Sequence, residues 1–288
     1  MWWEDLLINL LASFVWFILG VAGTSLVAFF VLVLPGQKRK KQLIRFFDLD
    51  PENPVAIIYL SNLITPHEEQ FHAPATFRYQ QGDQKIFIGS FRGSAVPSAE
   101  LGLVTHISMA LQNDPLQGWP GFLQKLLVNR WKAFRPVHVS FRVSPNQALP
   151  FFGWRFETLL TVGSGTYNSV TNYYDERREG RLELKSDPYR IIALQEVKQG
   201  QEFYPTDPEK PGGLAILEKI VDSVNGTTVF IASGAGALGT MGAVQYLMRE
   251  WESLYKQFGN TPFSAVMEFR LENSASMDEL HPSSIHFI

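Results

Sequence analysis

The sequence predicts an α/β protein, with one N-terminal transmembrane helix followed by a Rossmann-like mixed sheet that carries helices on its faces. Two observations support this prediction. Residues 6–34 are almost wholly apolar, and no Asp, Glu, Lys or Arg lies between Asp5 and Lys38. Beyond this segment, strand-like apolar runs alternate with helix-like segments and hairpins, a pattern typical of a mixed sheet flanked by helices.

The composition sets outer limits on the fold and function. The chain has 288 residues, enough for one large domain or two small ones, and a net charge of −3. This charge gives no indication of nucleic-acid binding. The sequence contains no cysteine. Disulfides, thiolate zinc sites and a cysteine nucleophile are therefore excluded, and the composition fits a reducing compartment.

The apolar N-terminal segment is long enough to cross a membrane. At about 1.5 Å per residue it exceeds a bilayer core of about 30 Å. A cleaved signal peptide would begin with basic residues and carry a shorter apolar run, whereas this chain begins with MWWED. We therefore expect residues 1–36 to form a retained, single-pass transmembrane anchor.

The basic residues that follow the apolar segment predict its orientation. They are Lys38, Arg39, Lys40, Lys41 and Arg45. Since basic flanks stay in the cytoplasm, we expect the N-terminus outside a bacterial inner membrane and the C-terminal part inside. Residues 37–53 would form a basic linker that meets anionic lipid heads, and residues 54–288 the cytosolic α/β domain.

The first half of this domain reads as strands around one helix. We expect a strand at residues 53–60, followed by a hairpin of TFRYQ and KIFIG separated by QGD. Residues 98–112 begin with a serine cap and carry apolar residues at helical spacing, which predicts a helix. Further strands are expected at residues 137–143 and 156–162. Between the helix and these strands, residues 121–135 form a basic amphipathic helix, which either packs on the sheet or lies on the inner leaflet.

The second half predicts hairpins, a long helix and a last strand. LELKS and YRIIALQEV form a second hairpin. LAILEKIV fits a strand or a helix, and the pair Asn225-Gly226 after it favours a hairpin into TTVFIAS. A helix is expected from about Thr240 to Phe258, then a strand at SAVMEFRL. The remaining tail, with Glu279, His281 and His286, is interpreted as solvated.

The stretch FIASGAGALGTMGAVQYL matches the G-x-G-x-x-G dinucleotide fingerprint between a strand and a helix. Glycines let a backbone pass close to a ligand, and the free N–H groups of a helix start attract anions. The acidic residue usual about 20 positions later has no clean counterpart. The alternative is a tight turn whose small residues let the helix pack on the sheet.

Two other loops share this strand–glycine–helix order. They are LLTVGSGTYNSVTNYY and IGSFRGSAVPSAELG. If their strands are parallel neighbours, the loops meet at the sheet edge where open α/β sheets bind ligands. The expected binding residues are Gly89, Arg92, Gly93, Gly163, Gly165, Thr166, Asn168, Gly234, Gly236, Gly239 and Thr240. Arg92 would clamp a phosphate through its fork of donors, or it is a surface arginine.

TVGSGTYNSVTNYY and VFIASGAGALGTMGAVQYLMREW together resemble the paired glycine loops of Rossmann-like ligand-sensing domains in prokaryotic proteins. Some such domains lie behind a single membrane anchor in defence or signalling systems. The resemblance covers about residues 54–270 and implies a nucleotide-derived ligand. No catalytic residue carries over by matching.

The sequence thus favours a membrane-anchored cytosolic sensor that binds a nucleotide-like anion and signals to or through its anchor. An enzyme acting on a nucleotide or sugar-nucleotide at the same edge, and a structural membrane subunit without ligand, remain alternatives. Glu100 is expected to favour the helix dipole, with a catalytic acid as the alternative. The spacing of His67 and His72 fits no established zinc site, so no metal is expected. The expected partners are the lipid bilayer, the small molecule and either a second copy or other membrane subunits.

Overall fold

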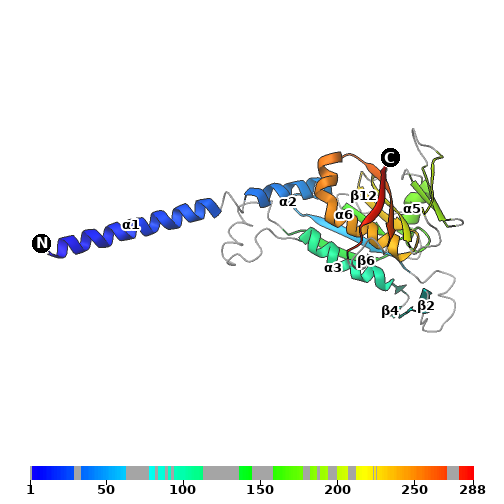
Figure 1. Cartoon of the computed structure of the whole chain (residues 1–288), viewed down its shortest axis with the longest axis horizontal. Helices are drawn as coiled ribbons and strands as arrows, with labels where there is room; N and C mark the ends of the chain where they lie inside the picture. The colour runs from blue at the N-terminus through cyan, green and yellow to red at the C-terminus, as the bar shows by residue number, and fades with distance from the viewer. Residues whose placement is uncertain are drawn as a thin grey trace. The chain divides into compact units, whose positions relative to one another are not determined.

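The computed structural model describes residues 2–28, 34–62, 78–81, 84–87, 90–91, 94–112, 136–144, 158–177, 182–186, 189–193, 200–206, 212–222, 224, 226–270 and 279–288. The chain forms two units (Figure 1). One comprises Met1–Gln42 and Asp114–Arg135, and the other Leu43–Asn113 and Pro136–Ile288. The second unit contains the sheet.

The N-terminal segment forms a single 27-residue helix, α1 (Trp2–Ala28). Its described large apolar side chains are exposed: Trp3, Leu7, Leu10, Leu11, Phe14, Val15, Trp16, Phe17, Ile18, Leu19, Val21 and Val27. Within the described part of the chain, no helix combines the length and the apolar character that a membrane crossing requires. The transmembrane assignment of residues 1–36 therefore stays a prediction.

The expected linker is helical over much of its length, as α2 (Leu34–Phe46). The side chains of Leu43, Phe46 and Phe47 are almost completely buried, so the sheet-bearing unit begins at Leu43 and not at residue 54. Asp48, two residues beyond the end of the helix, has φ +52. The N–H of Leu49 donates to the Ile44 carbonyl at 2.8 Å, and that of Asp48 to the Arg45 carbonyl at 3.1 Å. These bonds form a Schellman cap.

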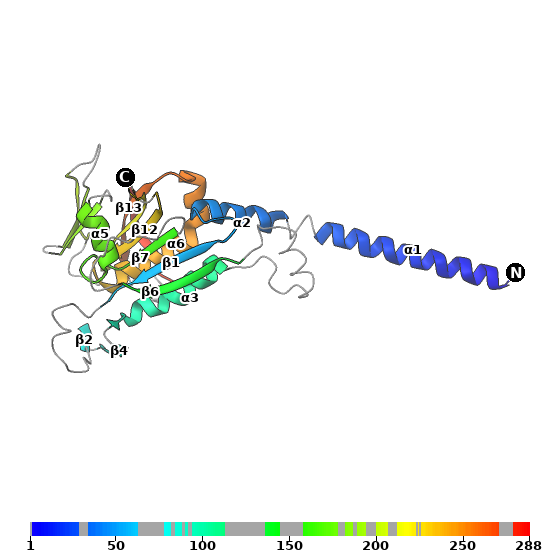
Figure 2. The same ribbon diagram turned by 180° about the vertical axis from the view of Figure 1, so that it is seen from behind.

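The central sheet has seven strands in the order β14-β13-β11-β12-β7-β1-β6. Their bounds are β1 Val55–Leu60, β6 His138–Val143, β7 Thr158–Val162, β11 Gly212–Val221, β12 Thr228–Gly234, β13 Phe263–Arg270 and β14 Pro282–Phe287. The four strands β6, β1, β7 and β12 are parallel, and Figure 2 shows them side by side. β11, β13 and β14 continue the sheet in antiparallel pairs. The predicted mixed sheet is confirmed.

Helices cover both faces of this sheet. α3 (Ser98–Gln112) and α6 (Gly236–Phe258) contact each other on one face, where Leu160, Phe230 and Trp251 belong to the main core cluster. α5 (Ser169–Arg177) lies on the other face. There Leu159 packs with Val170 and Tyr174 of α5. Neighbouring residues such as Leu159 and Leu160 enter different cores because successive side chains of a strand point to opposite faces.

Smaller sheets complete the described structure. β8 (Leu182–Ser186), β9 (Tyr189–Ala193) and β10 (Glu202–Phe203) form a three-stranded antiparallel sheet. β2 (Arg78–Gln81) pairs with β3 (Gln84–Phe87), and β4 (Ser90–Phe91) pairs with β5 (Ser94–Ala95). The three hairpins predicted from the sequence, β2 with β3, β8 with β9 and β11 with β12, are confirmed. The amphipathic helix expected at residues 121–135 lies outside the described residues.

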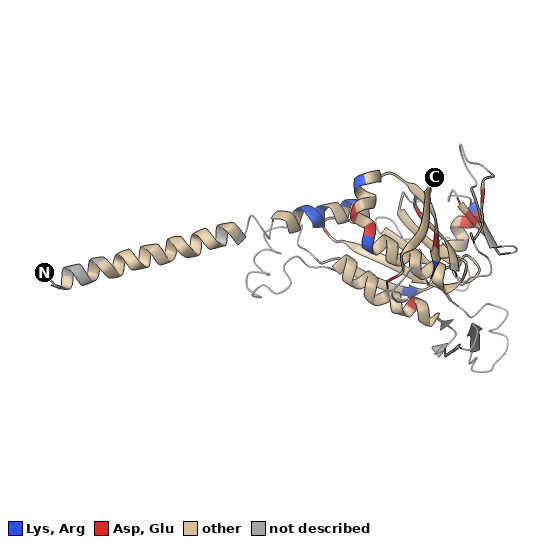
Figure 3. Ribbon diagram, viewed as in Figure 1, with Lys and Arg blue, Asp and Glu red and all other residues tan. Residues whose placement is uncertain are grey.

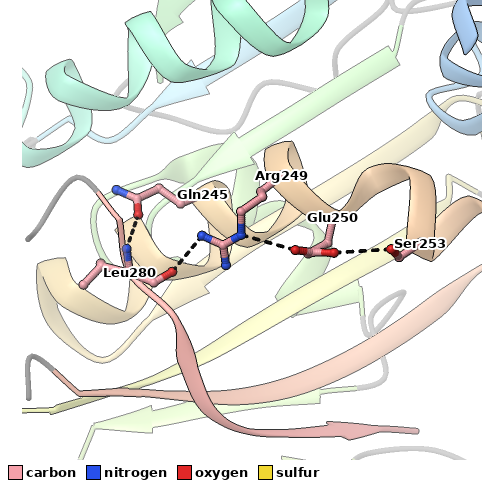
Figure 4. A network of polar contacts seen from close by, with 5 residues as sticks. All are labelled: Gln245, Arg249, Glu250, Ser253 and Leu280. Carbon is pink, nitrogen blue, oxygen red and sulfur yellow. Dashed lines mark hydrogen bonds and ion pairs between the residues drawn. The ribbon is translucent and has the colours of Figure 1, made fainter. Parts of the chain in front are cut away.

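The C-terminal tail forms an edge strand of the sheet, and Glu279, His281 and His286, which were expected to be solvated, are exposed. Pro282–Phe287 forms β14 at the edge of the sheet, beside β13. Figure 4 shows how Leu280, two residues before β14, is held against α6. Its N–H donates to Gln245 Oε1 at 2.8 Å, and its carbonyl accepts from Arg249 Nη1 at 3.1 Å. The Leu280 side chain is fully buried. The polar sequence of the tail concealed this docking because its apolar residues are few and widely spaced.

Candidate functional site

The order of the strands reverses between β1 and β7. After β1 the chain passes through α3 to β6 on one side, whereas after β7 it passes through α5 and later reaches β12 on the other side. β1 and β7 are themselves paired and parallel. Open α/β sheets bind ligands outside the carboxyl ends of their strands at such a reversal point. The candidate site is therefore the carboxyl edge of β1 and β7, with β6 and β12 on either side.

Three residues from separate elements meet at this reversal point. Glu100, in the first turn of α3, is 5% exposed, and its Oε2 accepts the N–H of Ser61 at 2.7 Å. Gly163 directly follows β7 and has φ +102. A Cβ on Gly163 would stand 1.9 Å from Ser61 Oγ and 2.9 Å from Glu100 Oε1. Only glycine allows the end of β7 to approach the other two residues so closely.

Burial raises the pKa of the Glu100 carboxyl from 4.5 to about 7, against the opposing effect of its hydrogen bonds from Ser61. A carboxyl group that titrates near neutral pH in a ligand crevice is suited to proton transfer. From its sequence position Glu100 is expected mainly to favour the helix dipole, and no motif indicates Ser61. The one local signal for Ser61 is its place directly after a buried strand.

The side chain of Asn168 holds the edge together. Its Nδ2 donates to the carbonyls of Tyr59 at 3.0 Å and of Val162 at 2.8 Å, so it joins β1 to β7. Its Oδ1 accepts the N–H groups of Val170 at 3.0 Å and Thr171 at 3.3 Å, so it also caps α5. These bonds use both donors and the acceptor of the amide. A structural role therefore accounts for this residue fully.

The neighbouring residues of the same loop differ in their surroundings. A Cβ on Gly165 would stand 2.7 Å from Asp175 Oδ2 and 3.2 Å from the Asn172 Cα. This glycine thus lets the loop approach α5. Thr166 is exposed to solvent.

At the junction of β12 and α6, Gly234 and Gly239 allow close packing. A Cβ on Gly234 would stand 2.5 Å from the carbonyl carbon of Gly239, and one on Gly239 would stand 2.4 Å from the Leu214 carbonyl oxygen. Both residues therefore allow α6 to pack closely on β12 and β11, which is the packing alternative. Thr240 is buried next to them.

Gly236 has different surroundings from these two glycines. Its φ is +76, and no heavy atom lies within 4 Å of the position a Cβ would take. Ala235, the cap residue of α6, provides no side-chain cap bond. The start of α6 is therefore open at the carboxyl edge.

The two loops lie at one edge, as expected, because β7 and β12 are parallel neighbours. Gly89, Arg92 and Gly93 of the third loop lie outside the described residues. No cluster of three or more metal-ligating side chains occurs in the part of the chain that the structure describes.

No family model matches the chain, and neither a known protein nor a solved structure shows significant similarity to it. The site is therefore interpreted from its own geometry.

Proposed function

We propose that the sheet-bearing unit is a ligand-sensing domain that binds an anionic, nucleotide-like small molecule at the carboxyl edge of β1, β7 and β12. The observation that carries the proposal is the reversal of strand order between β1 and β7, where Gly163 admits Ser61 and Glu100. The open start of α6 at Gly236 supports an anionic ligand, because backbone N–H groups at a helix start favour negative charge.

The opposite ends of the same strands offer a route for a signal. Thr158, the first residue of β7, donates a hydrogen bond to the Phe47 carbonyl. Thr228, the first residue of β12, donates to Asp48 Oδ2 at 2.7 Å. Strands β7 and β12 therefore carry the glycine loops at one end and hold the end of α2 at the other. A ligand-dependent shift of either strand would act directly on α2.

We further propose that α1 anchors the protein in the inner membrane, with its N-terminus outside and the sheet-bearing unit in the cytoplasm. At about 1.5 Å per residue α1 is about 40 Å long, and its described apolar side chains are exposed. Figure 3 shows no charge on the described side chains of α1 and several basic residues along α2. Exposed Lys38, Lys41 and Arg45 support the cytoplasmic placement.

Two alternatives keep specific support. The pKa of about 7 at Glu100 favours an enzyme that acts on a nucleotide or sugar-nucleotide, with Glu100 as general acid or base. The tight packing at Gly234 and Gly239 and the saturated amide of Asn168 favour a structural subunit without ligand.

A nucleotide panel tests the proposal on the full-length chain in detergent. The panel contains AMP, ADP, ATP, cyclic AMP and their guanosine counterparts, and the measurement is the melting temperature at rising ligand concentration. A sensor should melt at a higher temperature with at least one panel member, because a ligand that binds only the folded state stabilises it. If the wild type consumes the nucleotide and the Glu100→Gln variant still binds it, the protein turns the nucleotide over, and the enzyme alternative is favoured.

A matched pair of variants locates the binding. Gly236→Ala should weaken nucleotide affinity, whereas Gly259→Ala at the other end of α6 should not. Both glycines have positive φ, +76 and +60, with no atom near the added Cβ, so both substitutions carry similar backbone strain. If no panel member raises the melting temperature, the sensor proposal fails and the structural alternative is preferred.

A further inference from the structure

We propose that Arg142 is the side chain that binds the phosphate of the ligand, beside an exposed aromatic ring at Tyr167. The inference rests on the proposed function and deepens it. It adds a second contact for negative charge, on the face of the sheet that α5 covers, to the contact proposed at the start of α6 on the opposite face.

The register of the strands places Arg142 at the carboxyl edge. Arg142 pairs with Tyr59 of β1, and Tyr59 pairs with Thr161 of β7, so the three residues form a row just before the strands end. Tyr59 packs in the core cluster that contains α5 residues. Thr161 Oγ1 lies 2.8 Å from Thr171 Oγ1 of α5. Because in-register residues of parallel strands share a face, Arg142 also lies on the α5 face.

The guanidinium of Arg142 retains most of its hydrogen-bonding capacity. Its Nη1 donates a long hydrogen bond to the Tyr59 hydroxyl at 3.5 Å. Among the described residues, no carboxylate forms an ion pair with it, whereas Arg249 and Arg270 each pair with a glutamate. Arg142 is exposed. An arginine fork without a carboxylate is suited to a phosphate, which it binds through two parallel hydrogen bonds.

The loop between β7 and α5 brings an aromatic residue to the same place. The carbonyl of Tyr167 accepts the N–H of Asn62 at 2.7 Å and the hydroxyl of Ser144 at 3.4 Å. Asn62 lies just beyond β1 and Ser144 just beyond β6. Tyr167 is therefore held over the ends of the two strands that carry Tyr59 and Arg142.

The Tyr167 side chain is 44% exposed. A half-exposed aromatic ring offers a stacking surface for a planar base. The ring and the guanidinium together fit a phosphate joined to a planar heterocycle, which is the chemistry of a nucleotide.

The phosphate clamp expected from the sequence is Arg92, which lies between Gly89 and Gly93 in a loop motif. Arg142 belongs to no motif. In HVSFRV it reads as an ordinary outward-facing residue of an alternating strand. Its place at the candidate site follows from the pairing of β6 with β1.

The test compares Arg142→Gln and Arg142→Lys with the control Arg177→Gln in the full-length chain in detergent. Arg177 is an exposed arginine at the far end of α5, stacked on Tyr173. The probes are the panel nucleotides that bind the wild type and their uncharged nucleosides, adenosine and guanosine, and dissociation constants are measured by calorimetry.

Arg142→Gln should weaken nucleotide binding roughly ten- to hundred-fold and leave nucleoside binding unchanged. Arg142→Lys should weaken nucleotide binding less, because lysine keeps the positive charge although it lacks the fork of donors. Tyr167→Leu should weaken both nucleotides and nucleosides, and Arg177→Gln neither.

Two outcomes overturn the inference in different ways. Unchanged nucleotide affinity in Arg142→Gln, with binding by the wild type, would remove Arg142 from the site and leave the proposed function standing. If no panel nucleotide binds the wild type, both the assignment of Arg142 and the proposed function fail. A matching loss of nucleoside affinity in Arg142→Gln would also count against a phosphate contact. Ligand-free melting temperatures of all variants identify any loss that comes from unfolding.

Discussion

Burial moves the pKa values of two side chains toward neutrality. It raises the pKa of Glu100 and lowers that of Lys219. Glu100 lies at the reversal point of the sheet, with a pKa of about 7. Lys219 lies on β11 at the end of α2. Its Nζ donates to the Phe46 carbonyl at 2.7 Å and stands 5.0 Å from the centre of the Phe46 ring. Desolvation lowers the pKa of Lys219 from 10.5 to about 8, although the charge of Asp48 opposes this shift. Each group therefore makes folding stability depend on pH in its own range.

Glu100 should make the protein more stable at acidic than at neutral pH. The folded state holds the proton up to about pH 7, whereas an unfolded chain releases it near 4.5. The contribution is therefore fully present below about pH 4.5 and is lost as the pH rises through about 7, by about 3 kcal/mol in all. Glu100→Gln should remove this dependence. Free energies of unfolding in denaturant between pH 5 and 8 measure it, and equal slopes in wild type and variant would contradict the prediction.

Lys219 should have the opposite effect in a different range. An unfolded chain keeps the lysine proton up to about pH 10.5, whereas the folded state loses it near 8. Stability should therefore rise by about 3 kcal/mol between these values. Lys219→Met should remove this rise while lowering stability through the lost bond to the Phe46 carbonyl. The difference between the unfolding free energies of wild type and variant, measured from pH 7.5 to 10.5, isolates the contribution of the lysine. A constant difference would show that the amine titrates normally.

At the scale of the elements, small residues determine how closely α6 approaches the sheet. A Cβ on Gly242 would stand 2.5 Å from Cγ of Phe269 on β13, and that ring is fully buried. Gly102 in α3 offers the contrast, since nothing lies within 4 Å of its Cβ position. Both glycines lie inside helices, where alanine is intrinsically favoured. Packing alone therefore distinguishes the two sites.

Gly242→Ala and Gly102→Ala should shift stability in opposite directions. Overpacking against the Phe269 ring should cost about 1–3 kcal/mol at Gly242. At Gly102 the same change should add about 0.5–1 kcal/mol, because alanine loses less conformational freedom in a helix. Ligand-free unfolding free energies of the two variants measure this. Similar values for both would mean that α6 can move away from β13 at little cost.

At the scale of the whole molecule, an apolar helix precedes a basic helix whose last turn belongs to the core of the sheet-bearing unit. α2 is buried at Leu43 and Phe46, and the bonds from Thr158, Lys219 and Thr228 hold the residues that end it. The last turn of α2 is therefore fixed to strands β7, β11 and β12 of the sheet. This arrangement suits a protein that passes a change of state between its ligand site and a membrane.

The orientation of the chain provides a test at this scale. A reporter active only in the cytoplasm, fused after Ile288, should be active. Replacing Lys38, Arg39, Lys40 and Lys41 by glutamine should reduce that activity, because basic residues next to an apolar segment keep their side in the cytoplasm. The same replacements at Arg249 and Lys256, within the sheet-bearing unit, should leave the orientation unchanged. Activity of an externally active reporter at Ile288 would contradict the proposed topology.

Local patterns alone determined much of the fold. The helical spacing of residues 98–112 matches α3, and Gly226, with φ +66, lies in the connection of the antiparallel pair β11 and β12. The order strand, glycine loop, helix is likewise as expected at β7 and α5 and at β12 and α6. These features depend on periodicity and turn chemistry, which are properties of neighbouring residues and can be read from a short stretch of chain.

Only the tertiary structure decided which residues the candidate site contains. Ser61 and Gly163 meet because β1 pairs with β7, and Arg142 reaches the edge because β6 pairs with β1. Asn168 caps α5 and bridges two strands. The end of α2 is part of the core. A sequence pattern indicates that a residue lies on a strand and which face it shares, but it does not specify the neighbouring strand. The contacts that define the site join residues far apart in the chain, so they exist only once the sheet has assembled.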